Sequence, residues 1–97
     1  TTYSEYTPWL YTLQDDLLPL MRLREIFALN LKSNRRGRNL SQEELADLAE
    51  IDRTYVSLLE RSEYSASLDM IERLARALEV PPLELLRTSK ANEEYTP

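Results

Sequence analysis

Residues 41–61 read SQEELADLAEIDRTYVSLLER, a stretch that contains the starts of two helices in close succession. Ser41 and Glu44 have the spacing of a capping box, in which each side chain hydrogen-bonds the backbone N–H of the other residue. Asp52 is a favoured N-cap for a second helix, so the first helix is expected to end near Ala49. Apolar residues stand at the hydrophobic-staple positions around both caps, Leu40 with Leu45 and Ile51 with Val56. The sequence therefore predicts two short helices with a tight turn between them.

The apolar residues of this stretch have the spacing of a helix-turn-helix motif, in which about three residues join two short helices. Counted from Gln42, the fourth, fifth, eighth, tenth, fifteenth and eighteenth positions of such a motif are buried. They are occupied by Leu45, Ala46, Ala49, Ile51, Val56 and Leu59. The fifth position must be small, because the second helix crosses closely over the first there, and Ala46 meets this requirement. We therefore predict a motif from about Gln42 to Arg61, with a plain helical bundle as the alternative.

Further helices are predicted on both sides of the motif. An amphipathic helix over 20–34 carries the apolar residues Leu20, Leu23, Ile26, Phe27 and Leu31. A polar break over 35–39, which holds the only glycine of the chain, is expected to follow it. Ser67 caps a helix whose apolar stripe is Leu68, Ile71, Leu74, Ala75 and Leu78. Pro82 suits the first position of a fifth helix, whose apolar residues are Leu83, Leu85 and Leu86.

The N-terminal part of the chain adds one more predicted helix. Thr7 and Pro8 match the preferences of an N-cap and of the first helical position, and Pro19 ends a helix over about 8–18. The sequence thus predicts an all-α fold in three parts. These are an N-terminal extension over 1–19, a helix-turn-helix domain over 20–88 built as a five-helix bundle, and a polar C-terminal tail over 89–97.

The composition narrows the classes of function. The chain has no cysteine and no histidine, which removes disulfides, thiolate metal sites and the commonest general base. A single glycine leaves no glycine-rich loop to hold phosphates. We therefore expect no cofactor, no metal and no small-molecule ligand, and an enzyme is the weakest functional hypothesis. No apolar run approaches the roughly 18 residues of a membrane span, so no membrane partner is expected and a cytoplasmic location fits.

The net charge of −5 argues mildly against a nucleic-acid partner, since nucleic-acid-binding proteins are usually basic. All 12 Lys and Arg residues, however, lie between Arg22 and Lys90. Five of the 17 acidic residues lie outside that span, namely Glu5, Asp15, Asp16, Glu93 and Glu94. The other 12 lie within it and balance the 12 basic residues, so the span is neutral. Charge at a docking surface matters more than the total, so the balance does not exclude DNA.

Five segments together resemble the lambda-repressor-like (Xre-type) helix-turn-helix family over about residues 26–86. They are Ser41–Ala46, Ile51–Ser57, Leu59–Arg61, Ser67–Leu68 and Ala77–Pro81. In size the chain is similar to the restriction–modification controller proteins of that family. The resemblance implies a lambda-repressor-like bundle and a cytoplasmic, nucleoid-associated regulator of transcription that binds DNA sequence-specifically, from a bacterium or phage.

The chain departs from the family pattern at two positions. Glu50 stands where glycine is usual, and a turn that needs positive φ would cost a non-glycine residue about 1 kcal/mol. The alternative is a turn of another geometry, which avoids that cost. Asn34 stands near the end of the first helix, where the family often has leucine, and is expected to cap that helix or end it early.

In such a family the second helix of the motif lies in the major groove of double-stranded DNA. The resemblance and the outward positions assign base contacts to Arg53, Thr54, Ser57 and Leu58. Arg53 would bond O6 and N7 of guanine, whereas Thr54 and Leu58 suit the methyl group of thymine. The alternatives are an exposed arginine or an ion pair with Glu50 at position 53, and a dimer contact or a scattered exposed leucine at position 58.

Phosphate contacts are expected around the motif, because free N–H groups at helix starts and basic side chains attract phosphate. We assign them to Gln42, Arg61, Tyr64, Ser65, Ser67, Arg36 and Arg38. Lys32 and Arg35 are expected to supply further positive charge nearby, with a solvated loop over 35–38 as the alternative. Tyr55 is ambiguous between packing and a phosphate contact.

One such unit reads only about four to six base pairs, so we expect a homodimer on a pseudo-palindromic operator. The expected dimer contacts are Val80, Leu83, Leu86, Trp9 and Leu13, with Leu58 as a further candidate. The alternative for the leucines is that they close the core of the monomer. The alternative function is a protein-interaction module or antitoxin-like partner on the same fold, with weak or no DNA binding.

Overall fold

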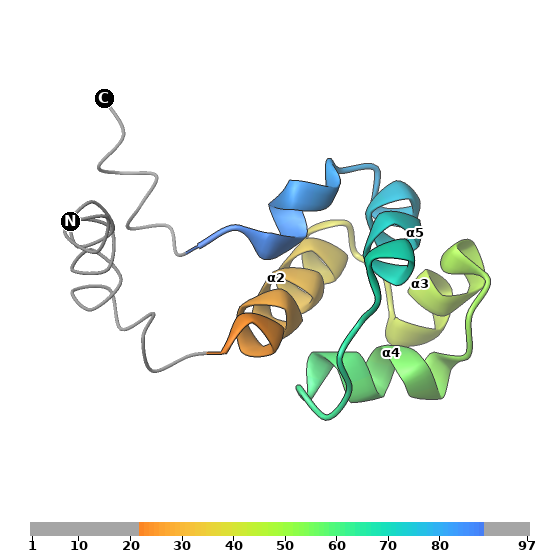
Figure 1. The fold of residues 1–97 in the computed structure, drawn as a ribbon. Helices are drawn as coiled ribbons and strands as arrows, with labels where there is room; N and C mark the ends of the chain where they lie inside the picture. The colour runs from red at the N-terminus through yellow and green to blue at the C-terminus, as the bar shows by residue number, and fades with distance from the viewer. Residues whose placement is uncertain (1–21, 89–97) are drawn as a thin grey trace, which may run out of the picture. The chain divides into compact units, whose positions relative to one another are not determined.

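Residues 22–88 are described by the structure, a computed structural model, and their regular secondary structure is helical with no strand among them (Figure 1). Four α-helices are followed by a short 3₁₀-helix. Their bounds are α2 Leu23–Gly37, α3 Gln42–Ala49, α4 Arg53–Glu60, α5 Leu68–Leu78 and η2 Pro82–Leu86. The all-α class is thus confirmed for this part of the chain, and the expected fifth helix is a 3₁₀-helix. The helix expected over 8–18 lies outside the described residues.

Three of the four N-caps predicted from the sequence are confirmed, and the fourth, Thr7, lies outside the described residues. Ser41 Oγ accepts a hydrogen bond from the backbone N–H of Glu44 at 2.9 Å, and Glu44 Oε1 accepts one from the N–H of Ser41 at 2.8 Å. Asp52 accepts from the N–H of Thr54 at 2.8 Å and begins α4. The hydroxyl of Ser67 accepts at 3.0 Å from the backbone of α5. Each cap satisfies a backbone donor that the helix itself leaves free, which fixes where the helix begins.

The predicted end of the first helix is wrong. Helix α2 begins at Leu23 and continues past Asn34 to Gly37, so residues 35–37 of the expected polar break form its last turn. The Nδ2 group of Asn34 donates to the carbonyl of Asn30 at 2.8 Å, one turn earlier, and does not cap the helix. The left-handed residue that ends this region is Asn39, with φ of 59°. Burial of Arg35 stabilises the last turn, and glycine, which costs a helix only about 1 kcal/mol, does not break it.

The turn between α3 and α4 keeps the glycine-type geometry without a glycine. Glu50 is the C-cap of α3 and is left-handed, with φ of 59° and ψ of 46°. Its N–H bonds the carbonyls of Ala46 and Asp47, as in a helix that ends on an αL residue. The same conformation recurs at Glu79 after α5. Each glutamate therefore carries about 1 kcal/mol of backbone strain.

The hydrophobic core lies where the motif predicts it. Of the six motif positions expected to be buried, five are buried in the structure and Ile51 is half-buried against the core. The fully buried large side chains come from every helix: Leu31, Leu45, Val56, Leu59, Leu74, Leu78 and Leu85. Helix α2 contacts both η2 and α4, and α3 packs on both α4 and α5 (Figure 1). Residues Leu23–Arg87 form one compact unit around this core.

Several leucines that have the spacing of an apolar stripe are exposed. Leu48 is 57% exposed, because the side of α3 defined by Leu45 and Ala49 faces the core and Leu48 lies one helical step beyond it. Leu68 is 81% exposed at the first position of α5, where the helix has not yet reached the core. Leu23 is likewise exposed at the start of α2. Helical spacing therefore predicts burial well in the middle of these helices and less well near their ends.

A side-chain clamp holds η2 against α2. The Nδ2 group of Asn30 donates to the carbonyl of Leu85 at 3.0 Å and to that of Arg87 at 2.8 Å. The two carbonyls lie at the end of the 3₁₀-helix, where a helix offers its last carbonyls no hydrogen-bond donor of its own. The clamp and the buried Leu85 together close the bundle on this side.

Candidate nucleic-acid interface

Helix α4 has a buried face and an outer face. Val56 and Leu59 are buried in the core and fix the rotation of the helix about its axis. Arg53 and Thr54, in the first turn, are exposed. The other two predicted base-contact residues, Ser57 and Leu58, are partly exposed. The structure therefore brings all four residues to solvent on one short helix, with the most accessible pair at its N-terminus.

Arg53 is free to meet a partner from outside. Within residues 22–88 its side chain makes no hydrogen bond and no ion pair, so the alternative of an ion pair with Glu50 is wrong. The backbone of Glu50 is instead approached by Arg73 of α5 at 3.5 Å. A guanidinium at the start of a helix, held by no partner among the described residues, suits bidentate hydrogen bonding to a base edge.

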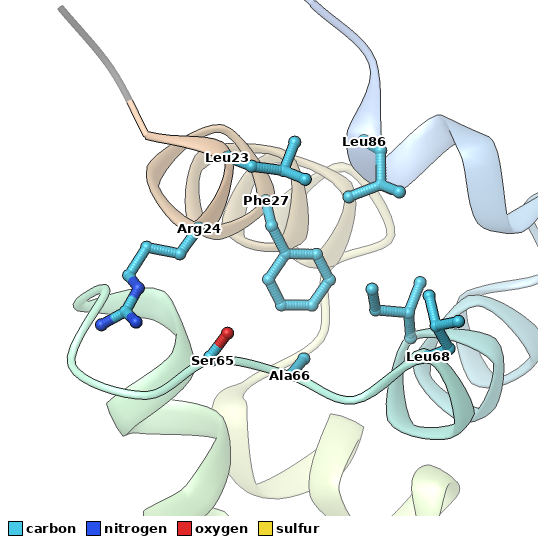
Figure 2. Close-up of a pocket in the computed structure, with 8 residues that line it drawn as sticks. Leu23, Arg24, Phe27, Ser65, Ala66, Leu68 and Leu86 are labelled. Atoms are coloured by element: carbon cyan, nitrogen blue, oxygen red, sulfur yellow. The ribbon is translucent and has the colours of Figure 1, made fainter.

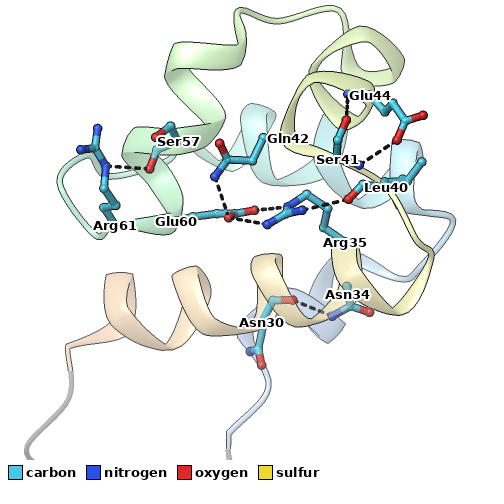
Figure 3. A network of polar contacts seen from close by, with 10 residues as sticks. All are labelled: Asn30, Asn34, Arg35, Leu40, Ser41, Gln42, Glu44, Ser57, Glu60 and Arg61. Atoms are coloured by element: carbon cyan, nitrogen blue, oxygen red, sulfur yellow. Dashed lines mark hydrogen bonds and ion pairs between the residues drawn. The ribbon is translucent and has the colours of Figure 1, made fainter.

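A buried polar network joins α2, α3 and α4 (Figure 3). Glu60, the last residue of α4, accepts from Arg35 Nε at 2.6 Å and from Arg35 Nη2 at 3.0 Å. The side chains are 10% exposed for Arg35 and 2% exposed for Glu60. Arg35 Nη1 donates to the carbonyl of Leu40 at 2.8 Å, and Gln42 Nε2 donates to Glu60 Oε1 at 3.0 Å. The start of α3 is therefore tied to the end of α4.

This network corrects the role given to Arg35. The sequence predicts that Arg35 lies in a polar break and supplies positive charge near the phosphates. The structure instead buries Arg35 in α2 and pairs its charge with Glu60. A signal was present in the sequence, because Arg35 follows Phe27 and Leu31 at intervals of four residues. Glu60 follows Val56 at the same interval. Opposite charges in two inward-facing stripes indicate a buried ion pair.

The candidate phosphate contacts near the motif are partly accessible. Gln42, half-buried at the first position of α3, lies at the α4 end that carries Glu60. Arg61 is the C-cap of α4 and is exposed, with Nε donating to the carbonyl of Ser57 at 3.3 Å and Nη1 lying 3.8 Å from Glu63. Because α4 has eight residues, its two ends are roughly 12 Å apart. Arg53 and Gln42 therefore mark opposite ends of the α4 surface.

Two further arginines at the end of α2 differ in their surroundings. Arg36 is exposed in the last turn and makes no side-chain hydrogen bond or ion pair within the described part of the chain. Arg38 lies 3.4 Å from Glu79, beyond α5, in an exposed ion pair. Exposed pairs of this kind are weak, so Arg38 can still exchange Glu79 for another anion.

The loop between α4 and α5 holds the remaining phosphate candidates. Tyr64 is exposed and packs edge to face on Tyr55, with ring centroids 5.7 Å apart. Tyr55 is half-buried against the core, which favours the packing role for it. Ser67 uses its hydroxyl oxygen to cap α5, and only its O–H remains for an anion. Ser65 is exposed and lines a pocket.

That pocket lies between the start of α2, the 65–68 segment and the end of η2 (Figure 2). Its wall is mostly apolar, with Leu23, Phe27, Leu68 and Leu86 among its members. Of the expected dimer residues, Val80 and Leu86 are half-buried against the core, whereas Leu83 is 77% exposed. Trp9 and Leu13 lie outside the described residues.

Residues 22–88 contain no group of three potential metal ligands. No helix in that span is both long and apolar enough to cross a bilayer.

Known proteins match this arrangement in sequence and in structure. A family model described as helix-turn-helix matches residues 31–85. The control protein C.SmaI from Serratia marcescens is 42% identical over 76 residues, which cover 76% of this chain and 89% of C.SmaI. The crystal structure of the hypothetical transcription factor NHTF from Neisseria matches with a TM-score of 0.71 and 38% identity, over 75% of this chain and 84% of that chain. The restriction–modification controller protein C.Esp1396I, a tetramer in complex with its natural 35 base-pair operator, matches with a TM-score of 0.62 and 27% identity, over 69% of this chain and 99% of that one.

Proposed function

Because the chain belongs to the helix-turn-helix family, we propose that it is a transcriptional regulator of the controller type that binds operator DNA sequence-specifically. The observation that carries this proposal is α4, which is fixed in rotation by two buried residues and presents at its exposed start an arginine that has no partner within residues 22–88. A relative solved on its operator supports DNA as the partner. Such a regulator is not an enzyme, and it would act at the nucleoid.

We infer that α4 enters the major groove with its N-terminus toward the base edges. Arg53 bonds O6 and N7 of a guanine, and Thr54 meets the neighbouring base. Ser57 allows close approach, and the exposed part of Leu58 contacts a thymine methyl group. The phosphates on either side are bound by Gln42, Arg61, Arg36, Arg38, Tyr64, Ser65 and Ser67.

Replacement of Arg53 by alanine tests the base-reading surface. We expect Arg53→Ala to cost about 1–3 kcal/mol of binding free energy and to relax the preference at one base pair, because a bidentate contact is lost. Sequences selected from a random duplex pool by the wild-type protein and the variant, followed by titrations, would measure both effects. Arg61→Ala is the matched control, since loss of a phosphate contact weakens binding to all sequences alike. An Arg53→Ala variant with unchanged affinity and unchanged preference would show that α4 does not read bases.

The proposal as a whole has a simpler test. A protein that binds DNA shows non-specific affinity for random duplexes at low salt, and this affinity falls steeply as salt rises. If the wild-type chain lacked such binding, the function would be wrong, and the protein-interaction module on the same fold would take its place.

We further propose that the protein binds its operator as a homodimer. The most exposed leucine of η2, Leu83, is available for a second copy, and the pocket walled by Leu23, Phe27 and Leu68 lies at the end of the same 3₁₀-helix. Two copies related by a twofold axis would present two α4 helices to a pseudo-palindromic site.

A charge at the centre of this surface should separate the copies. We expect Leu83→Glu to shift the protein from dimer to monomer in sedimentation experiments and to weaken operator binding about tenfold or more, since avidity between half-sites is lost. Leu48→Glu is the matched control, because Leu48 is a similarly exposed leucine on α3. An equal response of the two variants would contradict an interface at η2.

A further inference from the structure

The side chain of Gln42 is held in one orientation by a buried group. Its Nε2 atom donates to Glu60 Oε1 at 3.0 Å, and that carboxylate is in turn fixed by two hydrogen bonds from Arg35. The carboxylate is almost fully buried and attached to the end of α4. The amide of Gln42 therefore has its nitrogen toward the protein interior and cannot turn freely at the start of α3.

An amide nitrogen carries two N–H groups, and Glu60 uses one of them. The second N–H remains available on a residue that is only half-buried. Because a carboxylate accepts but does not donate, Glu60 selects the orientation in which Gln42 offers a donor. A phosphate oxygen is an acceptor as well, so this orientation matches the DNA backbone.

We propose that Glu60 is a positioning residue for DNA binding, holding the Gln42 amide so that its second N–H meets a backbone phosphate. This inference rests on the proposed function. It assigns the network a task beyond stability, because the same carboxylate sits at the end of the helix that reads the bases. Register on the phosphates and the placement of α4 are then set by one buried group.

The energetic benefit is preorganisation. A free glutamine side chain loses rotamer freedom when it binds, and an already ordered one does not. Ordering costs of this size correspond to about a fivefold change in affinity. Arg35 contributes indirectly, since it holds Glu60 in place and bonds the carbonyl of Leu40 just before the cap of α3.

A double-variant cycle separates positioning from stability. Replacing the pair by apolar residues of similar volume, Arg35→Met with Glu60→Leu, removes the acceptor, leaves the net charge unchanged and leaves no unpaired charge in the interior. We expect this variant to bind any duplex about fivefold more weakly, and Gln42→Ala to bind about tenfold more weakly. Combining all three changes should give the loss of Gln42→Ala alone, since Glu60 acts through Gln42. Independent losses would instead multiply to about fiftyfold and would overturn the proposal, as would a folded pair variant with wild-type affinity.

A second measurement uses the unaltered protein. The two Nε2 protons of Gln42 give separate resonances in a side-chain amide spectrum. On titration with duplex DNA, the proton that is free of Glu60 should shift and the bonded one should stay nearly constant. Equal shifts of both protons, or of neither, would refute the inference even if the pair variant did not fold. A wild-type chain that binds no random duplex at low salt would instead refute the proposed function itself.

Discussion

Replacing Arg35 by methionine is expected to lower the free energy of unfolding by about 3–5 kcal/mol. The change leaves the carboxylate of Glu60 buried, with Gln42 as its only remaining side-chain partner in the network. The variant loses the Coulomb attraction of Arg35, which in the wild type offsets the cost of removing the carboxylate from water. The desolvation cost itself remains. A unit of this size is stabilised by roughly 3–10 kcal/mol, so the variant should lose a large part of its free energy of unfolding.

Urea denaturation followed by circular dichroism at one fixed protein concentration would measure this loss, since dimerisation makes apparent stability depend on concentration. The control is the double variant Arg35→Met with Glu60→Leu, which removes both charges. We expect its free energy of unfolding to lie within about 1–2 kcal/mol of the wild-type value or above that value, because apolar side chains need no charged partner. A single variant as stable as the double one would show that water reaches Glu60 and that the pair is not buried in solution.

Local chemistry explains which parts of this fold are predictable from the sequence. The sequence identifies Ser41, Asp52 and Ser67 as N-caps, because a short oxygen-bearing side chain satisfies backbone donors within its own turn. The sequence does not predict the end of α2, because that end depends on the contact of Arg35 with a residue 25 positions later in the chain. A glycine at position 37 favours a break only when nothing else stabilises the last turn.

The candidate site likewise has a part that is predictable from the sequence and a part that is not. The outward positions of Arg53 and Thr54 follow from the inward ones of Val56 and Leu59, because helix periodicity fixes all four together. Pairing partners do not follow from periodicity. The hydrogen bond from Gln42 to Glu60, on which the further inference depends, is a contact between side chains of different helices. Only the recurrence of single charges in apolar stripes indicates such contacts in advance.

Leu59→Ala is expected to cost about 2–5 kcal/mol of unfolding free energy, the usual range for a fully buried leucine in a packed core. Leu59 lies on the inner face of α4, so its truncation leaves a cavity under the DNA-reading helix itself. The urea midpoint should fall strongly. Affinity for the operator should fall only as far as the folded fraction does, because no contact with DNA is removed.

Leu68→Ala is the matched control for this prediction. The apolar spacing of the sequence puts Leu68 in the core just as it does Leu59, but the structure leaves Leu68 largely exposed. Its truncation should therefore change stability by no more than about 0.5 kcal/mol. Equal costs for the two leucines would mean that the start of α5 packs against the bundle in solution. Arg53→Ala completes the contrast, since it should weaken DNA binding while the urea midpoint stays constant. A helix whose inner residue controls folding and whose outer residue controls binding is what the proposed function requires of α4.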